Sequence, residues 1–202
     1  MKILKFKILI INSLLLILFF LGILNVQCST DKLFSKNCLQ AGNTYRVKRV
    51  FDGDTILIEA EKTASTGNKK NEYKIRFLGI DAFEHDQLPY GPKAWDFLTM
   101  LVLNKKVCIE TDVQEQDRYG RTLGYVFLVS KSVNEELLRN GQALLYDFPP
   151  NIKYIDKLKK AETYARKNML GVWEKQDYIA ETPAQWRHKH PHKYNKKKHK
   201  TN

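Results

Sequence analysis

The chain has 202 residues, with 34 Lys and Arg against 22 Asp and Glu and a formal net charge of +12. A chain of this length has room for one ordinary domain with extensions, which excludes two full-sized domains. The excess of positive charge suits a polyanionic partner, but it also suits a soluble basic protein without one. Composition alone therefore does not assign a function.

The first 28 residues have the pattern of a targeting segment. Lys2, Lys5 and Lys7 precede an apolar stretch over residues 8–26, which is the arrangement of a signal peptide. The stretch is also long enough to span a bilayer, and Cys28 follows it where a lipidated cysteine would lie. A cleaved signal, a lipid anchor and an uncleaved membrane anchor all stay open. Each of them predicts a protein that is secreted, periplasmic or held at the cell surface.

A single domain is expected over residues 44–180, after a polar leading segment at residues 29–43. Apolar and polar residues alternate on both sides of Asp52-Gly53, a pair that is typical of a hairpin turn. A polar loop over residues 61–72 follows. Further strands are predicted at residues 73–78, 107–111 and 122–129.

Three helices are predicted among these strands. One runs from Gly91-Pro92 to about Leu103, because proline is tolerated in a first turn where its missing N–H would have no partner. A second covers about residues 134–139 and ends at Asn140-Gly141, and a third covers about residues 154–169. This order of elements indicates an α+β domain and is compatible with a small Greek-key barrel.

Residues 181–202 are expected to form a disordered tail that is basic and rich in histidine. A solvated tail is the simplest interpretation. Electrostatic capture of nucleic acid or of an anionic surface is the second. Adventitious binding of a transition metal by His188, His190 and His192 is the third.

Two cysteines, Cys38 and Cys108, remain if Cys28 is removed or lipidated. An exported protein could join them in a disulfide. Two free thiols are the alternative, since the sequence does not show whether their Cα atoms lie close enough.

Three short segments carry charged groups that suit one kind of chemistry, namely F-D-G-D-T (51–55), R-F-L-G-I-D-A-F-E (76–84) and D-R-Y-G-R (117–121). Their carboxylates could hold Ca²⁺ or Mg²⁺, and their arginines could bind phosphate oxygens in two-point fashion. A further carboxylate can orient or deprotonate water. The set predicts hydrolysis of a phosphodiester. A solvated hairpin turn and a surface ion pair between Arg76 and Glu84 are the alternatives that need no site.

The order and spacing of these segments resemble those of the staphylococcal nuclease (thermonuclease) family. The resemblance runs from about Tyr45 to Trp173 and includes Y-G-P-K-A-W-D-F (90–97), V-N-E-E-L-L-R-N-G-Q-A (133–143) and A-E-T-Y-A-R-K-N-M-L-G-V-W (161–173). It implies a five-stranded OB-like Greek-key β-barrel with about three α-helices.

The resemblance also implies a cation site. Asp54 and Asp81 match the aspartates that ligate one Ca²⁺ ion, and Ala82 stands where a backbone carbonyl completes the ligands. Glu84 matches the glutamate that positions the attacking water. We therefore expect Ca²⁺ as the cofactor.

The substrate-binding residues follow from the same likeness. Arg76 and Arg121 match the arginines that hold the phosphate and stabilise the transition state. Arg118 and Tyr119 match residues that contact a terminal phosphate of the bound nucleotide. Tyr146 could belong to a base-stacking wall or be an ordinary core or rim aromatic.

Two departures from the family pattern lie beside the expected site. Ala82-Phe83 stands where the family usually has Thr-Pro or Ala-Pro, so the loop is expected to be less rigid and Glu84 less tightly placed. The loop from Glu84 to Tyr90 is also short, which could alter access.

Together these features predict an exported or surface-held, Ca²⁺-dependent, sugar-nonspecific nuclease that acts on DNA and RNA as a monomer. The family's chemistry implies 3′-phosphate products, and stacking on aromatic side chains favours single-stranded substrate. A catalytically silent nucleic-acid-binding module at the membrane and a structural surface protein are the rival interpretations. The presence of all five expected charged residues, Asp54, Arg76, Asp81, Glu84 and Arg121, argues against both.

Overall fold

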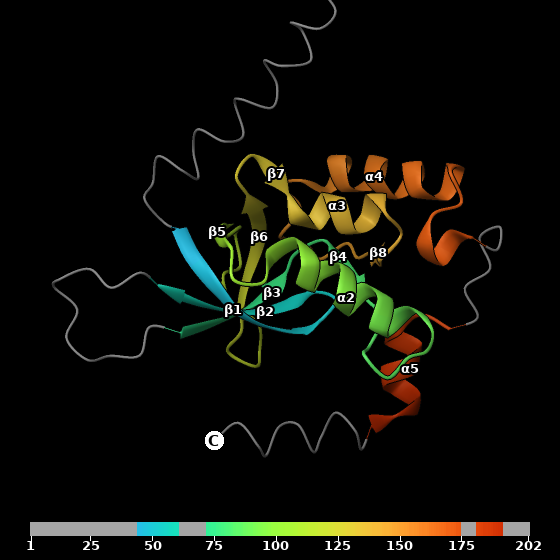
Figure 1. Cartoon of the computed structure of the whole chain (residues 1–202), viewed down its shortest axis with the longest axis horizontal. Helices are drawn as coiled ribbons and strands as arrows, with labels where there is room; N and C mark the ends of the chain where they lie inside the picture. Colours follow the sequence, from blue (N-terminus) through green and yellow to red (C-terminus); the bar gives the residue numbers. More distant parts are fainter. Residues whose placement is uncertain (1–43, 61–71, 175–180, 192–202) are drawn as a thin grey trace, which may run out of the picture.

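The computed structural model describes residues 44–60, 72–174 and 181–191, and its centre is a closed β-barrel (Figure 1). The sheet order is β3-β2-β1-β5-β6, and β3 also pairs in parallel with β6, which closes the barrel. The remaining neighbours in the barrel are antiparallel. The expected five-stranded OB-like barrel of an α+β domain is confirmed. Its strands are β1 (Thr44–Asp52), β2 (Thr55–Ala60), β3 (Glu72–Phe77), β5 (Lys106–Glu110) and β6 (Thr122–Leu128).

Alternation of apolar residues along these strands produces the core. Side chains two residues apart point to the same face of a strand. In β1 a register shift between Val47 and Arg49 lets Val47 and Val50, which are three residues apart, share the buried face. The buried members of β1, β2 and β3 are Val47 and Val50, Ile56 and Ile58, and Ile75 and Phe77, all at most 6% exposed. The short strand β7 (Lys131–Ser132) extends the sheet at β6.

Three helices pack on the barrel as the sequence predicts, with ends within two residues of those expected. They are α2 (Tyr90–Val102), α3 (Val133–Arg139) and α4 (Ile155–Lys167), and α3 lies beside α4 (Figure 1). Each buries an apolar stripe, such as Ala94, Leu98 and Val102 of α2. The Ser132 hydroxyl begins α3 by accepting the backbone N–H of Glu135 at 3.2 Å.

A second, smaller sheet supports the region that follows β3. Strand β4 (Ile80–Ala82) pairs antiparallel with β8 (Ala143–Leu145), placing Asp81 opposite Leu144. Next to it, Phe83 packs in a small core with Ala165, Val172 and Trp173. The last two belong to the short 3₁₀ helix η1 (Gly171–Trp173). Neither short strand was predicted, because three residues carry too little periodicity to be recognised.

A fourth helix, α5 (Pro183–Lys189), lies within the segment that the sequence assigned to a disordered tail. The Thr182 hydroxyl accepts the N–H of Gln185 at 3.3 Å, and the Gln185 side chain accepts the N–H of Thr182 at 2.8 Å. Thr-Pro-x-Gln at residues 182–185 is the sequence signature of such a capping box, so the helix could have been recognised. The described residues therefore contain four α-helices instead of about three.

Several sequence predictions concern residues outside the described ranges. The targeting segment, the polar leading segment, Cys38 and residues 192–202 are among them. Cys108 forms a disulfide bond, which excludes a free thiol there, while Cys38 lies outside the described residues and its pairing stays a prediction. Within residues 44–60, 72–174 and 181–191, no helix has the length and apolar character to cross a membrane.

Candidate active site

The turn between β1 and β2 places Asp54 at the edge of the barrel. Asp52 pairs with Thr55, so Gly53 and Asp54 form a two-residue hairpin turn, and the Asp54 N–H donates to Oδ1 of Asp52 at 3.1 Å. A Cβ added at Gly53 would lie 2.7 Å from Cβ of Ala82 and 2.8 Å from that of Ala94. The turn therefore needs glycine because it packs against β4 and α2, and this packing brings Asp54 to Ala82.

Asp54 is buried, with 5% of its surface exposed, and its carboxylate is fully engaged. Oδ1 accepts the Thr55 hydroxyl at 3.0 Å, and Oδ2 accepts the backbone N–H of Ala82 at 2.7 Å. Arg76 Nη1 lies 2.5 Å from the same Oδ2. Burial raises the pKa of Asp54 well above its ordinary value, and the positive charge of Arg76 acts in the opposite direction. Burial therefore disfavours the ionised carboxylate of Asp54, while the charge of Arg76 favours it.

Arg76 bridges the two aspartates that the sequence assigned to a cation. Its Nη2 lies 2.8 Å from Oδ1 of Asp81, while Nη1 contacts Asp54, and its side chain is 14% exposed. Burial acts to lower the pKa of Arg76, but attraction to Asp54 and Asp81 outweighs it and the pKa is raised. Arg76 is therefore a fixed positive charge between two buried carboxylates.

Glu84 is held by the loop that follows β4. The Phe83 side chain is 1% exposed, and its ring centroid lies 5.2 Å from that of Tyr90. The Glu84 carbonyl accepts the N–H of Gln87 at 2.7 Å. Phe83, which stands where the family usually has proline, thus packs the loop against the protein by burial, and how rigidly Glu84 is held stays a prediction.

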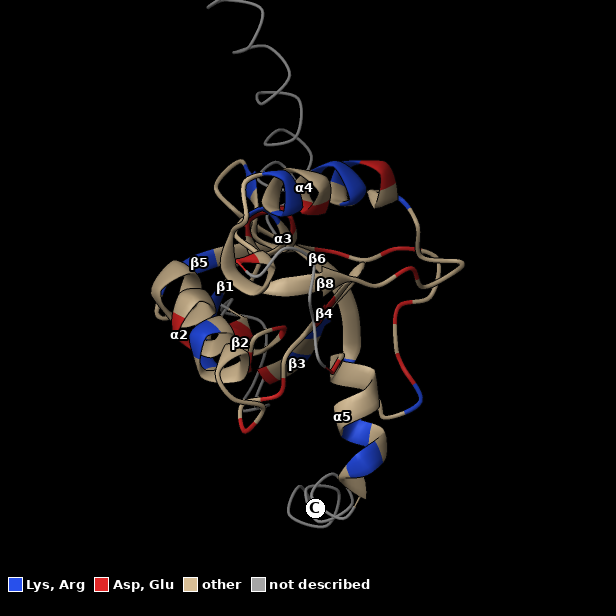
Figure 2. Ribbon diagram, turned by 90° about the vertical axis from the view of Figure 1, so that its right-hand side faces the viewer, with Lys and Arg blue, Asp and Glu red and all other residues tan. Residues whose placement is uncertain are grey.

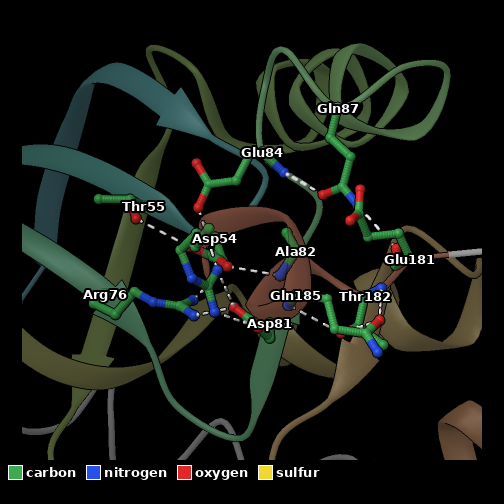
Figure 3. Close-up of polar contacts among 11 residues, drawn as sticks. Asp54, Thr55, Arg76, Asp81, Ala82, Glu84, Gln87, Glu181, Thr182 and Gln185 are labelled. Atoms are coloured by element: carbon green, nitrogen blue, oxygen red, sulfur yellow. Dashed lines mark hydrogen bonds and ion pairs between the residues drawn. The ribbon is translucent and has the colours of Figure 1, made fainter. Parts of the chain in front are cut away.

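Arg187 of α5 joins the site, and no pattern in the sequence pointed to it. Its Nη1 and Nη2 lie 3.0 and 2.7 Å from the two carboxylate oxygens of Asp81, and Nη1 lies 3.2 Å from Oε1 of Glu84. Attraction to these carboxylates raises the pKa of Arg187 even though burial opposes the charge. The close-up shows Asp54, Arg76, Asp81 and Glu84 gathered beside Thr182 and Gln185, where α5 begins (Figure 3).

Arg121, Arg118 and Tyr119 lie on the loop before β6. Leu123 pairs with Arg76 across β6 and β3, so the loop ends next to the carboxylate cluster. Arg121 Nε lies 2.6 Å from Oδ2 of Asp117, and the guanidiniums of Arg118 and Arg121 lie 4.9 and 5.7 Å from the Tyr119 ring centroid. The contacts described for Arg121 are therefore with its own loop. The carboxylate cluster is held by Arg76 and Arg187.

Tyr146 follows β8 and is 45% exposed, which excludes it from the core. Its ring stacks on Phe148, with centroids 6.0 Å apart and an interplanar angle of 26°, and its N–H donates to the Gly79 carbonyl at 3.0 Å. Tyr146 offers an exposed aromatic face, and Phe148 beneath it is partly buried against the core. A rim aromatic and a base-stacking surface both agree with this position.

The oxygen donors at this site suit a hard divalent cation. The carboxylates of Asp54 and Asp81 meet at Arg76, and Ala82 adjoins both. Ca²⁺ takes carboxylate and backbone carbonyl oxygens and completes its shell with water. In the described part of the chain, no three His, Cys, Asp or Glu side chains are arranged to hold a metal ion. Two carboxylates and one carbonyl would thus depend on water or substrate for the remaining ligands.

A closed OB-like barrel that gathers carboxylates and arginines at one edge has the architecture of a hydrolase acting on phosphate esters. The family model "Staphylococcal nuclease homologue" matches residues 74–175. The chain is 35% identical over 172 residues to the thermonuclease of Staphylococcus hyicus, covering 81% of this chain and 97% of that protein. It is 35% identical over 139 residues to the thermonuclease of Staphylococcus intermedius, covering 66% of this chain and 78% of that protein. The chain belongs to the staphylococcal nuclease family.

A third relative is the SPbeta prophage-derived endonuclease YokF of Bacillus subtilis strain 168. It is 38% identical over 140 residues, which cover 66% of this chain and 45% of that protein. The resemblance inferred from the motifs is thus confirmed.

Proposed function

We propose that this chain, a nuclease by family, hydrolyses phosphodiester bonds of DNA and RNA with the help of one Ca²⁺ ion. The observation that carries the proposal is the contact network of Asp54, Arg76 and Asp81 at one edge of the barrel, to which Arg187 links Glu84. Buried carboxylates and fixed arginines in one place are what attack of water on a phosphate requires.

The cation would be held by Asp54, Asp81 and the carbonyl of Ala82. When bound, Ca²⁺ polarises the phosphate and makes a nearby water more acidic. Glu84 orients the attacking water, and its loop supports this role because the backbone is fixed by Gln87. Arg76 and Arg121 bind phosphate oxygens and neutralise charge that develops on them. Products with 3′-phosphates follow from the family resemblance.

The substrate would lie along the exposed aromatic and basic groups beside the cluster. Arg118 and Tyr119 would contact a terminal phosphate, and Tyr146 with Phe148 would stack on bases. Stacking of this kind needs bases that are splayed apart, which favours single strands or melted duplex. The enzyme is proposed to act as a monomer.

An exported or surface-held location is part of the same proposal. The targeting pattern of residues 1–28 supports it. The disulfide at Cys108 supports it too, because disulfides persist mainly in oxidising compartments. A cleaved signal, a lipidated Cys28 and a retained anchor would all deliver this domain outside the cytosol.

The test is digestion of plasmid and RNA by residues 29–202 in Ca²⁺, in Mg²⁺ and in chelator. We expect Ca²⁺-dependent cleavage that Glu84→Ala and Arg121→Ala each reduce by at least about 100-fold, or about 3 kcal/mol of barrier. Glu59→Ala is the matched control, because Glu59 pairs with Lys48 on the exposed face of β2, where its side chain is 42% exposed. A folded protein that binds DNA in chelator but never cleaves it would instead be a nucleic-acid-binding module.

A further inference from the structure

Helix α5 places a guanidinium over the carboxylates that the proposed function assigns to cation and water. Arg187 contacts both oxygens of Asp81, at 3.0 and 2.7 Å, and also Oε1 of Glu84 at 3.2 Å. The Asp81 and Glu84 side chains are 6% and 14% exposed, while that of Arg187 is 34% exposed. Arg187 therefore reaches into the site from the solvent side.

The helix is docked by more than this one side chain. Gln87, which is 4% exposed and lies in the Glu84 loop, donates from Nε2 to the carbonyl of Glu181 at 2.9 Å. Pro183 in the first turn of α5 is buried. The capping box at Thr182 fixes where the helix begins. The start of α5 is thus attached to the loop that positions Glu84. Figure 2 shows Lys and Arg in the C-terminal part of the helix only.

Arg187 and a divalent cation need the same oxygens. Oδ2 of Asp81 accepts from Arg187, and Oδ1 is shared by Arg187 and Arg76. A guanidinium this close carries a positive charge that repels a cation, and its N–H groups fill the lone pairs that a cation would use. Arg76 and Arg187 together use both acceptor positions of Oδ1 and one of Oδ2, and the charge of Arg187 opposes a cation at the position that remains, so tight ligation by Asp81 requires Arg187 to leave.

We propose that Arg187 competes with the divalent cation for Asp81 and Glu84, which makes α5 an autoinhibitory helix displaced by cation binding. The inference rests on the proposed function only in requiring that the site binds a cation. Displacement is feasible because the cation would replace the positive charge of Arg187 beside Asp81, and the released guanidinium, whose side chain is already 34% exposed, would return to water. Among the described residues, the seven-residue helix α5 makes fewer contacts with other elements than the barrel strands make with one another. It can therefore move without unfolding the core.

The first readout is the Ca²⁺ dissociation constant of residues 29–202, measured by calorimetry without substrate. Arg187→Ala should bind Ca²⁺ at least about tenfold more tightly than the natural chain, equivalent to about 1.4 kcal/mol. Arg187→Lys keeps the charge but loses the two-point geometry. Its affinity for Ca²⁺ should therefore lie between the affinities of the natural chain and of Arg187→Ala. Lys189→Ala is the charge-matched control on the same helix. Lys189 pairs with Glu181 at 2.7 Å and is 68% exposed, so its removal should change affinity less than about twofold.

The second readout is amide hydrogen exchange in α5. The N–H groups of Trp186 and His190 donate to the carbonyls of Thr182 and Trp186. A helix this short is unstable once it leaves the barrel, so saturating Ca²⁺ should accelerate exchange at both amides in the natural chain. Exchange in β1 and β2 should not accelerate.

Three results would overturn the inference in distinguishable ways. Equal Ca²⁺ affinity of the natural chain and Arg187→Ala, with clear binding by both, would show that Arg187 does not compete. Ca²⁺ binding without faster exchange at Trp186 and His190 would show that the helix stays docked. Absence of Ca²⁺ binding in every variant, with a folded barrel, would instead refute the proposed cation site on which the inference rests.

Discussion

A Cβ added at Gly91 would lie 1.8 Å from the carbonyl oxygen of Glu84. Gly91 is the second residue of α2, and its N–H donates to the Gln87 carbonyl at 2.8 Å. The residue proposed to orient water is therefore packed directly against the start of a helix. The chain tolerates this approach only because Gly91 has no side chain.

Gly91→Ala should shift the Glu84 loop and lower both stability and activity. Forcing one methyl group into a packed contact costs about 1–3 kcal/mol of unfolding free energy. Cleavage should fall by about 10- to 100-fold, because a misplaced catalytic group loses alignment. Denaturant unfolding and plasmid digestion measure the two effects. Gly53→Ala is a companion variant, since its Cβ would instead meet side chains of Ala82 and Ala94. Unchanged kinetics in Gly91→Ala would show that the loop adapts.

Phe83 should be essential to the fold even though relatives usually have proline there. It is 1% exposed and packs with Trp173, so Phe83→Ala should cost about 3–5 kcal/mol. Phe83→Pro restores the family's residue but removes most of the same ring, and it should also be destabilising. Tyr73→Ala, at a position 46% exposed, is the control for loss of an aromatic ring. A proline variant as stable as the natural chain would show that rigidity can replace burial.

Local patterns made most of the barrel and much of the site predictable. Alternating apolar residues identified the barrel strands, and turn chemistry placed Asp54 at a hairpin. Arg76, Asp81 and Glu84 follow one another within a single short segment, so their grouping could be inferred from it. The burial of Phe83 could not be inferred in this way, because its partners Val172 and Trp173 come much later in the chain.

Contacts at long range account for what was missed at the site. Arg187 meets Asp81 across 106 positions of sequence, and Gln87 meets Glu181 across 94. No periodicity links such pairs. The capping box of α5 was readable, but a cap predicts a helix and not the surface on which it docks. The basic composition after Arg187 favoured a solvated tail, and for that reason no helix was predicted there.

Asn134 should contribute strongly to stability, because it joins α3 to the barrel. It is fully buried, its Oδ1 accepts the N–H of Val126 at 2.9 Å, and its Nδ2 donates to the Leu78 carbonyl at 2.8 Å. Asn134→Ala would leave both backbone groups buried without these partners, at a cost of about 2–5 kcal/mol. Asn134→Asp keeps the shape and the acceptor but turns a carboxylate oxygen toward the Leu78 carbonyl, so at neutral pH it adds the cost of a buried charge to the loss of that bond. Denaturant midpoints of both variants measure the effect, with Thr163→Ala on the exposed face of α4 as control. A loss below about 1 kcal/mol in Asn134→Ala would contradict this role.

The buried carboxylate of Asp54, which the proposed chemistry uses, should lower the free energy of unfolding at neutral pH. Burial raises its pKa in the folded protein, so the neutral acid is the form that folding favours. By linkage, this stability is present below the unfolded pKa and is lost as pH rises through the folded pKa. Above that pH the ionised carboxylate opposes folding. The amide of Asp54→Asn has a similar shape and no charge to bury, so the variant should be more stable than the natural chain at neutral pH.

The stabilisation by Asp54→Asn should increase as pH rises above the ordinary aspartate pKa of 3.8 and level off above the folded pKa. Urea unfolding of both proteins across this range, in chelator, measures it. Cleavage should fall by at least about 100-fold in the same variant, which separates stability from activity at one residue. Saturating Ca²⁺ should stabilise the natural chain and have little effect on the variant, because a ligand stabilises only the state that binds it. A difference between the two proteins that does not change with pH would mean that Arg76 keeps Asp54 ionised throughout, so that its attraction exceeds the cost of burial.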